Sequence, residues 1–308
     1  MTKRIFAVTA TLALLGFGIA GRADVFNLGS GYTNLETVEV GDAGNTADTT
    51  GYGSVSYNYN IGKYEVTSKQ YCDFLNAKAK TDTYGLYSSY MWSNKYGCKI
   101  QQSGTSGNFS YSVTDDYANR PVNYVSYYDA CRFANWLNNG QGNGDTETGA
   151  YTMTSETITR SADYKWAVTS EDEWYKAAYY KGGETDAGYW LYPTQSDSVD
   201  TYRANYYNST TTDVGLYACP SAYGTFDQGG NVMEWNEELV SNTSHKLRGG
   251  SFKLDREYLK SSQSLSSFST DEMPTIGFRV VQAVPEPSSI IALLGGIGSL
   301  LASKRRKS

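Results

Sequence analysis

The sequence predicts a single α+β domain with little regular secondary structure, placed between two terminal targeting segments. Three observations predict this class: three short helices with clear caps, few and short strand patterns, and connecting segments rich in Gly, Ser, Thr, Asn and Tyr. The 308 residues include 28 Tyr, 10 Phe and 6 Trp, which supply the apolar area of a packed core and argue against disorder.

The three helices are predicted from their N-terminal caps. The segment Thr67–Gln70 is a capping box that opens a helix through about Lys78, and Ser126 caps a helix through Asn138. The segment Ser170–Glu173 is a further capping box. Apolar residues recur three and four positions apart after these caps, so each helix has one face for the core.

Short strands are predicted where β-branched and aromatic residues cluster between turn residues. The strand candidates are Ser54–Tyr59, Lys63–Val66, Lys165–Val168 and Phe278–Gln282. Before them, Asp24–Gly53 is polar and rich in Gly, which predicts a lead-in strand and a turn.

Charge and histidine content exclude several function classes. Residues 24–283 hold 19 Lys and Arg against 31 Asp and Glu, a net charge of −12. Nucleic acid and anionic lipid need a basic footprint, so we expect neither as a partner. The single histidine, His245, excludes three-His sites, two-His iron sites and the HExxH zinc motif. Its polar neighbours in 241–246 predict a solvated loop.

The N-terminus, residues 1–23, is typical of a secretory signal peptide. Lys3 and Arg4 precede the apolar stretch Ile5–Ala20, and a small-residue cleavage pattern ends at Ala23. Export would place the chain in an oxidising compartment. We therefore expect one or two structural disulfides among Cys72, Cys98, Cys131 and Cys219, with three pairings open.

The C-terminus, residues 284–308, has three parts: Val284–Pro287, the apolar run Ile290–Ala302 and the basic tail Lys304–Lys307. The run has 13 residues, below the ~20 that span a bilayer comfortably. This arrangement resembles the PEP-CTERM sorting signal. The resemblance implies export, transient anchoring in the inner membrane and cleavage by an exosortase-type protease, with extracellular polysaccharide or envelope proteins as surroundings. A plain tail anchor is the alternative.

Six motifs follow one another through the body of the chain. They are Tyr64–Thr67, Arg120–Ser126, Thr169–Trp174, Gly229–Trp235, Arg248–Phe252 and Ile276–Arg279. Their order resembles the formylglycine-generating enzyme family, also called the sulfatase-modifying factor domain, from about Gly51 to Val281. The resemblance implies one compact α+β domain over residues 24–283, related to the C-type lectin-like fold. It also favours a Cys72–Cys131 disulfide, because both helices belong to one core in that family.

The copper site that the resemblance implies is missing. In the family, two cysteines follow the Gly-Gly-Ser-aromatic motif by two and seven residues and bind copper, which suits soft thiolates. Counting from Phe252, this chain has Leu254 and Leu259. We therefore expect no copper and assign no catalytic residue. Ser251 has no adjacent base, which favours a turn residue over a nucleophile.

A calcium loop is the remaining site that the resemblance implies. Its ligands would be Asp227 and Glu234 through side chains, and Gly230 and Val232 through main-chain carbonyls. Hard Ca²⁺ prefers several oxygens, and glycine lets carbonyls turn inward. The alternative is a glycine turn before an edge strand with solvated acids.

Other acids have simpler interpretations. The first-turn acids Glu171–Glu173 are explained by the helix dipole, and Glu237 and Glu238 by a solvated face. Three function classes follow: a non-catalytic binding or structural module of the exported envelope, an enzyme with different chemistry in the same fold, and a lectin-like receptor. The missing cysteines favour the first.

Overall fold

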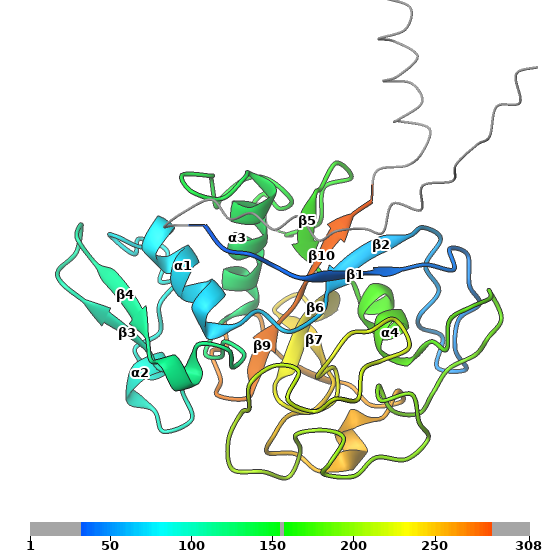
Figure 1. The fold of residues 1–308 in the computed structure, drawn as a ribbon. Helices are drawn as coiled ribbons and strands as arrows, with labels where there is room; N and C mark the ends of the chain where they lie inside the picture. The colour runs from blue at the N-terminus through cyan, green and yellow to red at the C-terminus, as the bar shows by residue number, and fades with distance from the viewer. Residues whose placement is uncertain (1–31, 155–156, 285–308) are drawn as a thin grey trace, which may run out of the picture.

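The computed structural model describes residues 32–154 and 157–284, coloured in Figure 1. The predicted signal peptide, and the sorting signal beyond Val284, lie outside the described residues. The strands are β1 Thr37–Val40, β2 Tyr59–Gly62, β3 Ile100–Ser103, β4 Ser110–Val113, β5 Trp166–Val168, β6 Met233–Ser241, β7 Ser244–Arg248, β8 Leu265–Phe268, β9 Ile276–Phe278 and β10 Val280–Ala283. The α-helices are α1 Ser68–Lys78, α2 Tyr90–Ser93, α3 Tyr127–Asn138 and α4 Glu171–Tyr179.

The three predicted helices are confirmed as α1, α3 and α4. Each begins with a complete capping box, in which the N-cap hydroxyl accepts from the third helical N–H and that residue's side chain accepts from the N-cap N–H. The pairs are Thr67 with Gln70, Ser126 with Asp129, and Ser170 with Glu173. These helices could be predicted because a cap and the turn it opens lie within a few residues.

Two four-stranded sheets organise the domain. The first has the order β1-β2-β10-β5 and is antiparallel throughout. The second has the order β8-β7-β6-β9, in which β6 and β9 run parallel. Figure 1 shows the C-terminal strand β10 beside β2 and β5, so it joins early and middle parts of the chain.

The strand predictions were only partly right. Lys165–Val168 is confirmed as β5, and Phe278–Gln282 is divided between β9 and β10. The predictions Ser54–Tyr59 and Lys63–Val66 were wrong, because the strand there is β2, Tyr59–Gly62, which pairs with β1 and β10. A strand needs a partner at the right place in the fold, and local composition does not show that partner.

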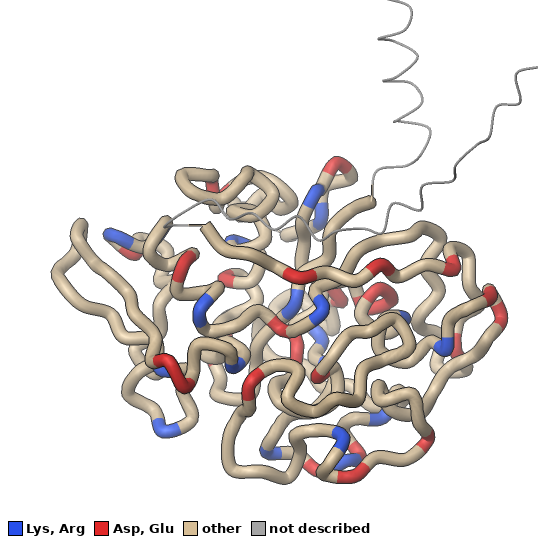
Figure 2. The backbone as a smooth tube through the Cα atoms, viewed as in Figure 1, with Lys and Arg blue, Asp and Glu red and all other residues tan. Residues whose placement is uncertain are grey.

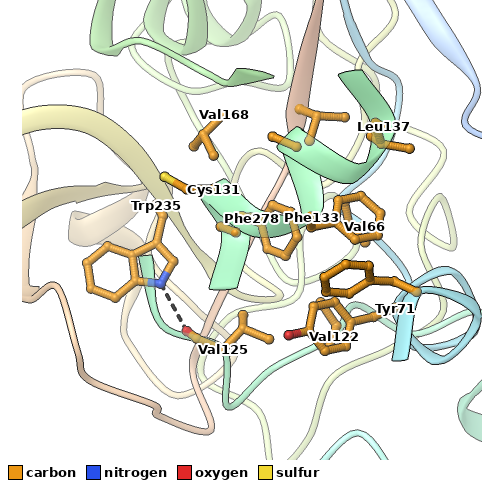
Figure 3. Close-up of a cluster of buried hydrophobic side chains, with 14 of the residues drawn as sticks. Val66, Tyr71, Val122, Val125, Cys131, Phe133, Leu137, Val168, Trp235 and Phe278 are labelled. Atoms are coloured by element: carbon orange, nitrogen blue, oxygen red, sulfur yellow. Dashed lines mark hydrogen bonds between the residues drawn. The ribbon is translucent and has the colours of Figure 1, made fainter. Parts of the chain in front are cut away.

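Aromatic side chains from both sequence halves form the core. Tyr71 on α1 stacks on Phe133 of α3 with ring centroids 6.0 Å apart, and Phe278 meets Phe133 edge-on at 5.4 Å. Figure 3 shows these rings together, with the indole of Trp235 donating to the carbonyl oxygen of Val125 at 3.0 Å. The core therefore joins α1 and α3 to strands of the second sheet.

The disulfide prediction was wrong. All four cysteines lie in the described residues and all are free thiols. The sulfur of Cys72 accepts from the Asn76 amide at 3.6 Å, and that of Cys98 donates to the Asn123 carbonyl at 3.8 Å. Burial raises the pKa of Cys72 and of Cys98 to about 11, so both remain protonated. Cys131 is a third buried thiol.

Figure 2 shows basic residues spread among acidic ones along the body of the chain. Within residues 32–154 and 157–284, no helix is both long and apolar enough to cross a membrane.

Candidate functional site

The predicted calcium loop leads directly into β6, and Glu234 is the second residue of that strand. Glu234 is fully buried and forms a bidentate ion pair with Arg279. The Nε atom of Arg279 lies 2.6 Å from Oε2, and Nη2 lies 2.7 Å from Oε1. The indole of Trp174 also donates to Oε2, at 2.7 Å. Both oxygens of Glu234 are therefore engaged by protein donors.

Arg279 is equally buried and has no contact with solvent. Its Nη1 and Nη2 atoms donate to the carbonyl oxygens of Gly62 and Phe226, each at 2.9 Å. Burial acts against the charge of the guanidinium, but Glu234 beside it raises the pKa of Arg279 above its ordinary value. The side chain is a fixed cation at the centre of the domain.

Two further carboxylates share this neighbourhood. Glu65 is 1% exposed, and neither of its oxygens has a hydrogen-bond partner. Burial, and then the charges of Asp227 and Glu234, raise the pKa of Glu65 well above its ordinary value. Asp227 is closely surrounded although part of its surface reaches solvent, and this burial raises its pKa to about 6. The charges of three carboxyl groups and one guanidinium thus influence one another.

The carboxyl groups at the predicted calcium site have the charge that a cation needs. The four predicted ligands, however, are only partly available to coordinate it. The excess of negative charge and the orphaned carboxyl of Glu65 suit a divalent cation. Gly230 has φ +89°, and a Cβ there would lie 2.3 Å from the Asn205 carbonyl, so only glycine fits. Glu234, however, is committed to Arg279. In the described part of the chain, no three His, Cys, Asp or Glu side chains converge on a metal position.

The two leucines at the positions of the family's copper-binding cysteines pack against apolar side chains. Leu259 ends a 3-10 helix and is fully buried in an apolar cluster with Tyr192 and Val199. Leu254 packs against the main core. Ser251 is buried, and its carbonyl accepts from the Leu254 N–H at 3.0 Å, which is the turn role predicted for it.

The first-turn acids of α4 are not simply dipole partners, and that interpretation was incomplete. Glu171 is buried and accepts from Arg248 Nε at 2.9 Å and from Lys246 at 3.2 Å. Glu173 is fully buried and pairs with Arg160 through two contacts of 2.8 Å. Burial works against the charge of Glu173, but Arg160 keeps its pKa below the ordinary value.

The predicted solvated face at the end of β6 is half right. Glu238 is exposed, but Glu237 accepts from Arg160 Nε at 2.9 Å and from the Tyr151 hydroxyl. Arg160 therefore links Glu237 on β6 to α4.

The solvated-loop prediction for His245 was wrong. His245 lies on β7, is 4% exposed and stacks on Tyr127 with ring centroids 3.5 Å apart. Its Nδ1 lies 2.8 Å from the Ser269 hydroxyl. Burial lowers the pKa of His245 to about 4, so the ring is neutral at physiological pH.

The sequence prediction missed Glu65 and Arg279 as site residues. Both stand in motifs that were recognised, Tyr64–Thr67 and Ile276–Arg279. The available signal was a single charged residue inside each otherwise apolar or small motif, because a charge in such a position needs a buried partner.

Comparison with known proteins agrees with this architecture. Residues 37–284 match the profile of the sulfatase-modifying factor enzyme 1-like domain, so the chain belongs to this family. Its fold is similar to that of Treponema denticola variable protein 1, with 18% identity, a TM-score of 0.54, and coverage of 82% of this chain and 97% of that chain. It is also similar to CarF, with 21% identity, a TM-score of 0.54, and coverage of 82% and 99%. No curated protein sequence matches the chain.

The buried carboxyl of Glu65 predicts a pH dependence of stability in the presence of a chelator. Because its folded pKa is raised, the unfolded chain loses this proton first, near pH 4.5. The stability of the wild type should therefore fall as pH rises above that value, relative to Glu65→Gln, by up to ~1.4 kcal/mol per pH unit.

Urea unfolding between pH 4 and 8 would measure this difference. Glu39→Gln, at an exposed residue of β1, is the matched control and should follow the wild type. Parallel stability curves for Glu65→Gln and the wild type would contradict the assignment.

Proposed function

We propose that this protein is an exported, non-catalytic binding or structural module of the sulfatase-modifying factor family. The observation that carries the proposal is Leu259, fully buried in an apolar cluster where the family resemblance places a copper-binding cysteine. A cysteine there needs an accessible position to bind metal and meet substrate, whereas Leu259 contributes to folding. Leu254 at the other position also packs inward.

The two chain ends support export and sorting. Residues 1–23 have the charge and hydropathy pattern of a signal peptide, and residues 284–308 combine Pro-Glu-Pro, a short apolar run and a basic tail. In this proposal an exosortase-type protease removes the tail. The acidic body is then released or transferred to the surface among polysaccharide and envelope proteins.

Calcium has a structural role in this proposal. Asp227, Glu234 and the carbonyls of Gly230 and Val232 would hold the ion, with Glu234 sharing its oxygens between the ion and Arg279, and the bound cation would lower the raised pKa of Glu65. A bound Ca²⁺ would compensate the carboxylates that Arg279 leaves unbalanced. It would stabilise the fold and take no part in a reaction.

The exported protein should form no aldehyde from a peptide cysteine in the presence of copper and oxygen. Mass spectrometry of the peptide and oxygen uptake measure this directly. The Leu254→Cys/Leu259→Cys variant is the matched control; because Leu259 is fully buried, the two cysteines alone should not restore aldehyde formation. Aldehyde formation by the wild type would overturn the proposed function.

Calcium removal should lower the melting temperature of the wild type. Ligand binding at a hundredfold excess over Kd stabilises by ~2.7 kcal/mol, which is several degrees for a domain of this size. Asp227→Asn should lose this sensitivity, while Asp213→Asn, at an exposed acid, should retain it. Identical wild-type melting curves with and without chelator would rule out the calcium role.

If the C-terminal segment is a sorting signal, the mature protein should lack it. Mass spectrometry of the protein from its own host should find a C-terminus near Val284–Pro287. Intact peptides that span Pro285 to Ser303 in most molecules would favour a plain tail anchor instead.

A further inference from the structure

A pocket of about 510 Å³ opens between the start of α3 and the β6–β7 hairpin, a size usual for small-ligand sites. The side chains that matter most for its chemistry are Tyr128, Arg132, Met153, Ile158, Leu239 and His245. It contains none of the carboxylates around Arg279 and neither of the leucines at the cysteine positions. It is therefore separate from both sites that the family resemblance implies.

The hydrogen bonds of His245 define which ring nitrogen carries the proton. The Ser269 hydroxyl donates to the Thr243 carbonyl at 3.0 Å, because a carbonyl can only accept. The same hydroxyl oxygen must then accept from Nδ1 of His245, 2.8 Å away. The neutral ring therefore has a bare acceptor at Nε2, and this buried atom has no partner. An unpaired buried acceptor is costly unless a ligand satisfies it.

Among the described residues that line the pocket, no charge is left uncompensated. Arg132 pairs with Glu147 through contacts of 2.8 and 3.2 Å and lies over the ring of Tyr84, 4.8 Å from its centroid. His245 is neutral. These described lining residues favour neither an anion nor a cation, whereas Tyr128 and Leu239 offer apolar contact in the same wall as His245.

Leu239 lies directly opposite His245 in the β6–β7 ladder and is 42% exposed. Both side chains line the pocket. The hairpin thus places an exposed apolar side chain opposite the histidine that carries the unsatisfied acceptor.

We infer that this pocket binds an uncharged sugar ring. A sugar hydroxyl would donate to Nε2 of His245, and the apolar C–H face of the ring would pack against Tyr128 and Leu239. Such a ligand supplies the hydrogen-bond donor that Nε2 lacks. It also presents an apolar face that fits the apolar side chains of this wall. The inference rests on the proposed function, since it gives the binding module its ligand class.

The test is isothermal titration of the exported protein with neutral oligosaccharides of glucose, galactose and N-acetylglucosamine, beside galacturonate oligomers. At least one neutral sugar should bind, and His245→Phe, which keeps the stacking on Tyr127, should weaken it at least tenfold. Leu239→Trp should block the pocket from an exposed position. Trp92→Ala, at a 40% exposed aromatic outside the pocket, should bind as the wild type does.

Several outcomes would overturn the inference: no binding of any neutral sugar, tighter binding of the acidic oligomers, or loss through Trp92→Ala with both pocket variants unaffected. If His245→Phe does not fold, Leu239→Trp decides alone. Failure here would leave the non-catalytic proposal standing. Aldehyde formation in the copper assay would remove that proposal whether or not a sugar binds.

Discussion

The buried ion pair between Arg279 and Glu234 holds the two sheets together. Arg279 is the single residue between β9, in the second sheet, and β10, in the first. It forms an ion pair with Glu234 on β6 and donates hydrogen bonds to the carbonyls of Gly62 and Phe226. These three residues belong to segments far apart in sequence. Removing one member of such a pair leaves an unpaired buried charge and costs ~3–5 kcal/mol. Substitutions at this ion pair should therefore be strongly destabilising. The pair thus fixes the relative position of the two sheets in a domain that has few regular elements.

Side-chain hydrogen bonds to backbone replace much of the missing secondary structure around that centre. Buried tyrosines donate to carbonyls of loops and helix ends: Tyr59 to Glu173 at 2.6 Å, and Tyr71 to Leu86 at 2.8 Å. Each ring fills core volume while its hydroxyl donates to a buried backbone carbonyl. The high tyrosine content is thus a structural requirement of long ordered loops, which weakens a general sugar-stacking role for these residues.

The helices were predictable and the buried polar residues were not, for one physical reason. A capping box such as Ser170–Glu173 is complete within four residues, so its pattern is visible in sequence. His245 and Glu65 have polar or mixed neighbours in sequence, and only the tertiary fold buries them. The cysteines could not be assigned from sequence either, because Cys72 and Cys131 belong to one core and are nevertheless both free thiols. The motif order identified the family, but it could not show a pocket formed by a hairpin and a helix start.

Strand β6 connects the fixed centre to the proposed sugar pocket, and its irregularity explains how one strand serves both. Glu234 near its start is locked by Arg279, whereas Leu239 toward its end is exposed at the pocket. Register shifts between Trp235 and Leu239 interrupt the ladder with β7, and such bulges redirect side chains without disturbing the strand before them. Substitutions at the hairpin end would therefore change the proposed pocket without removing the ion pair that stabilises the fold. A site beside Arg279 could not change in this way without loss of stability.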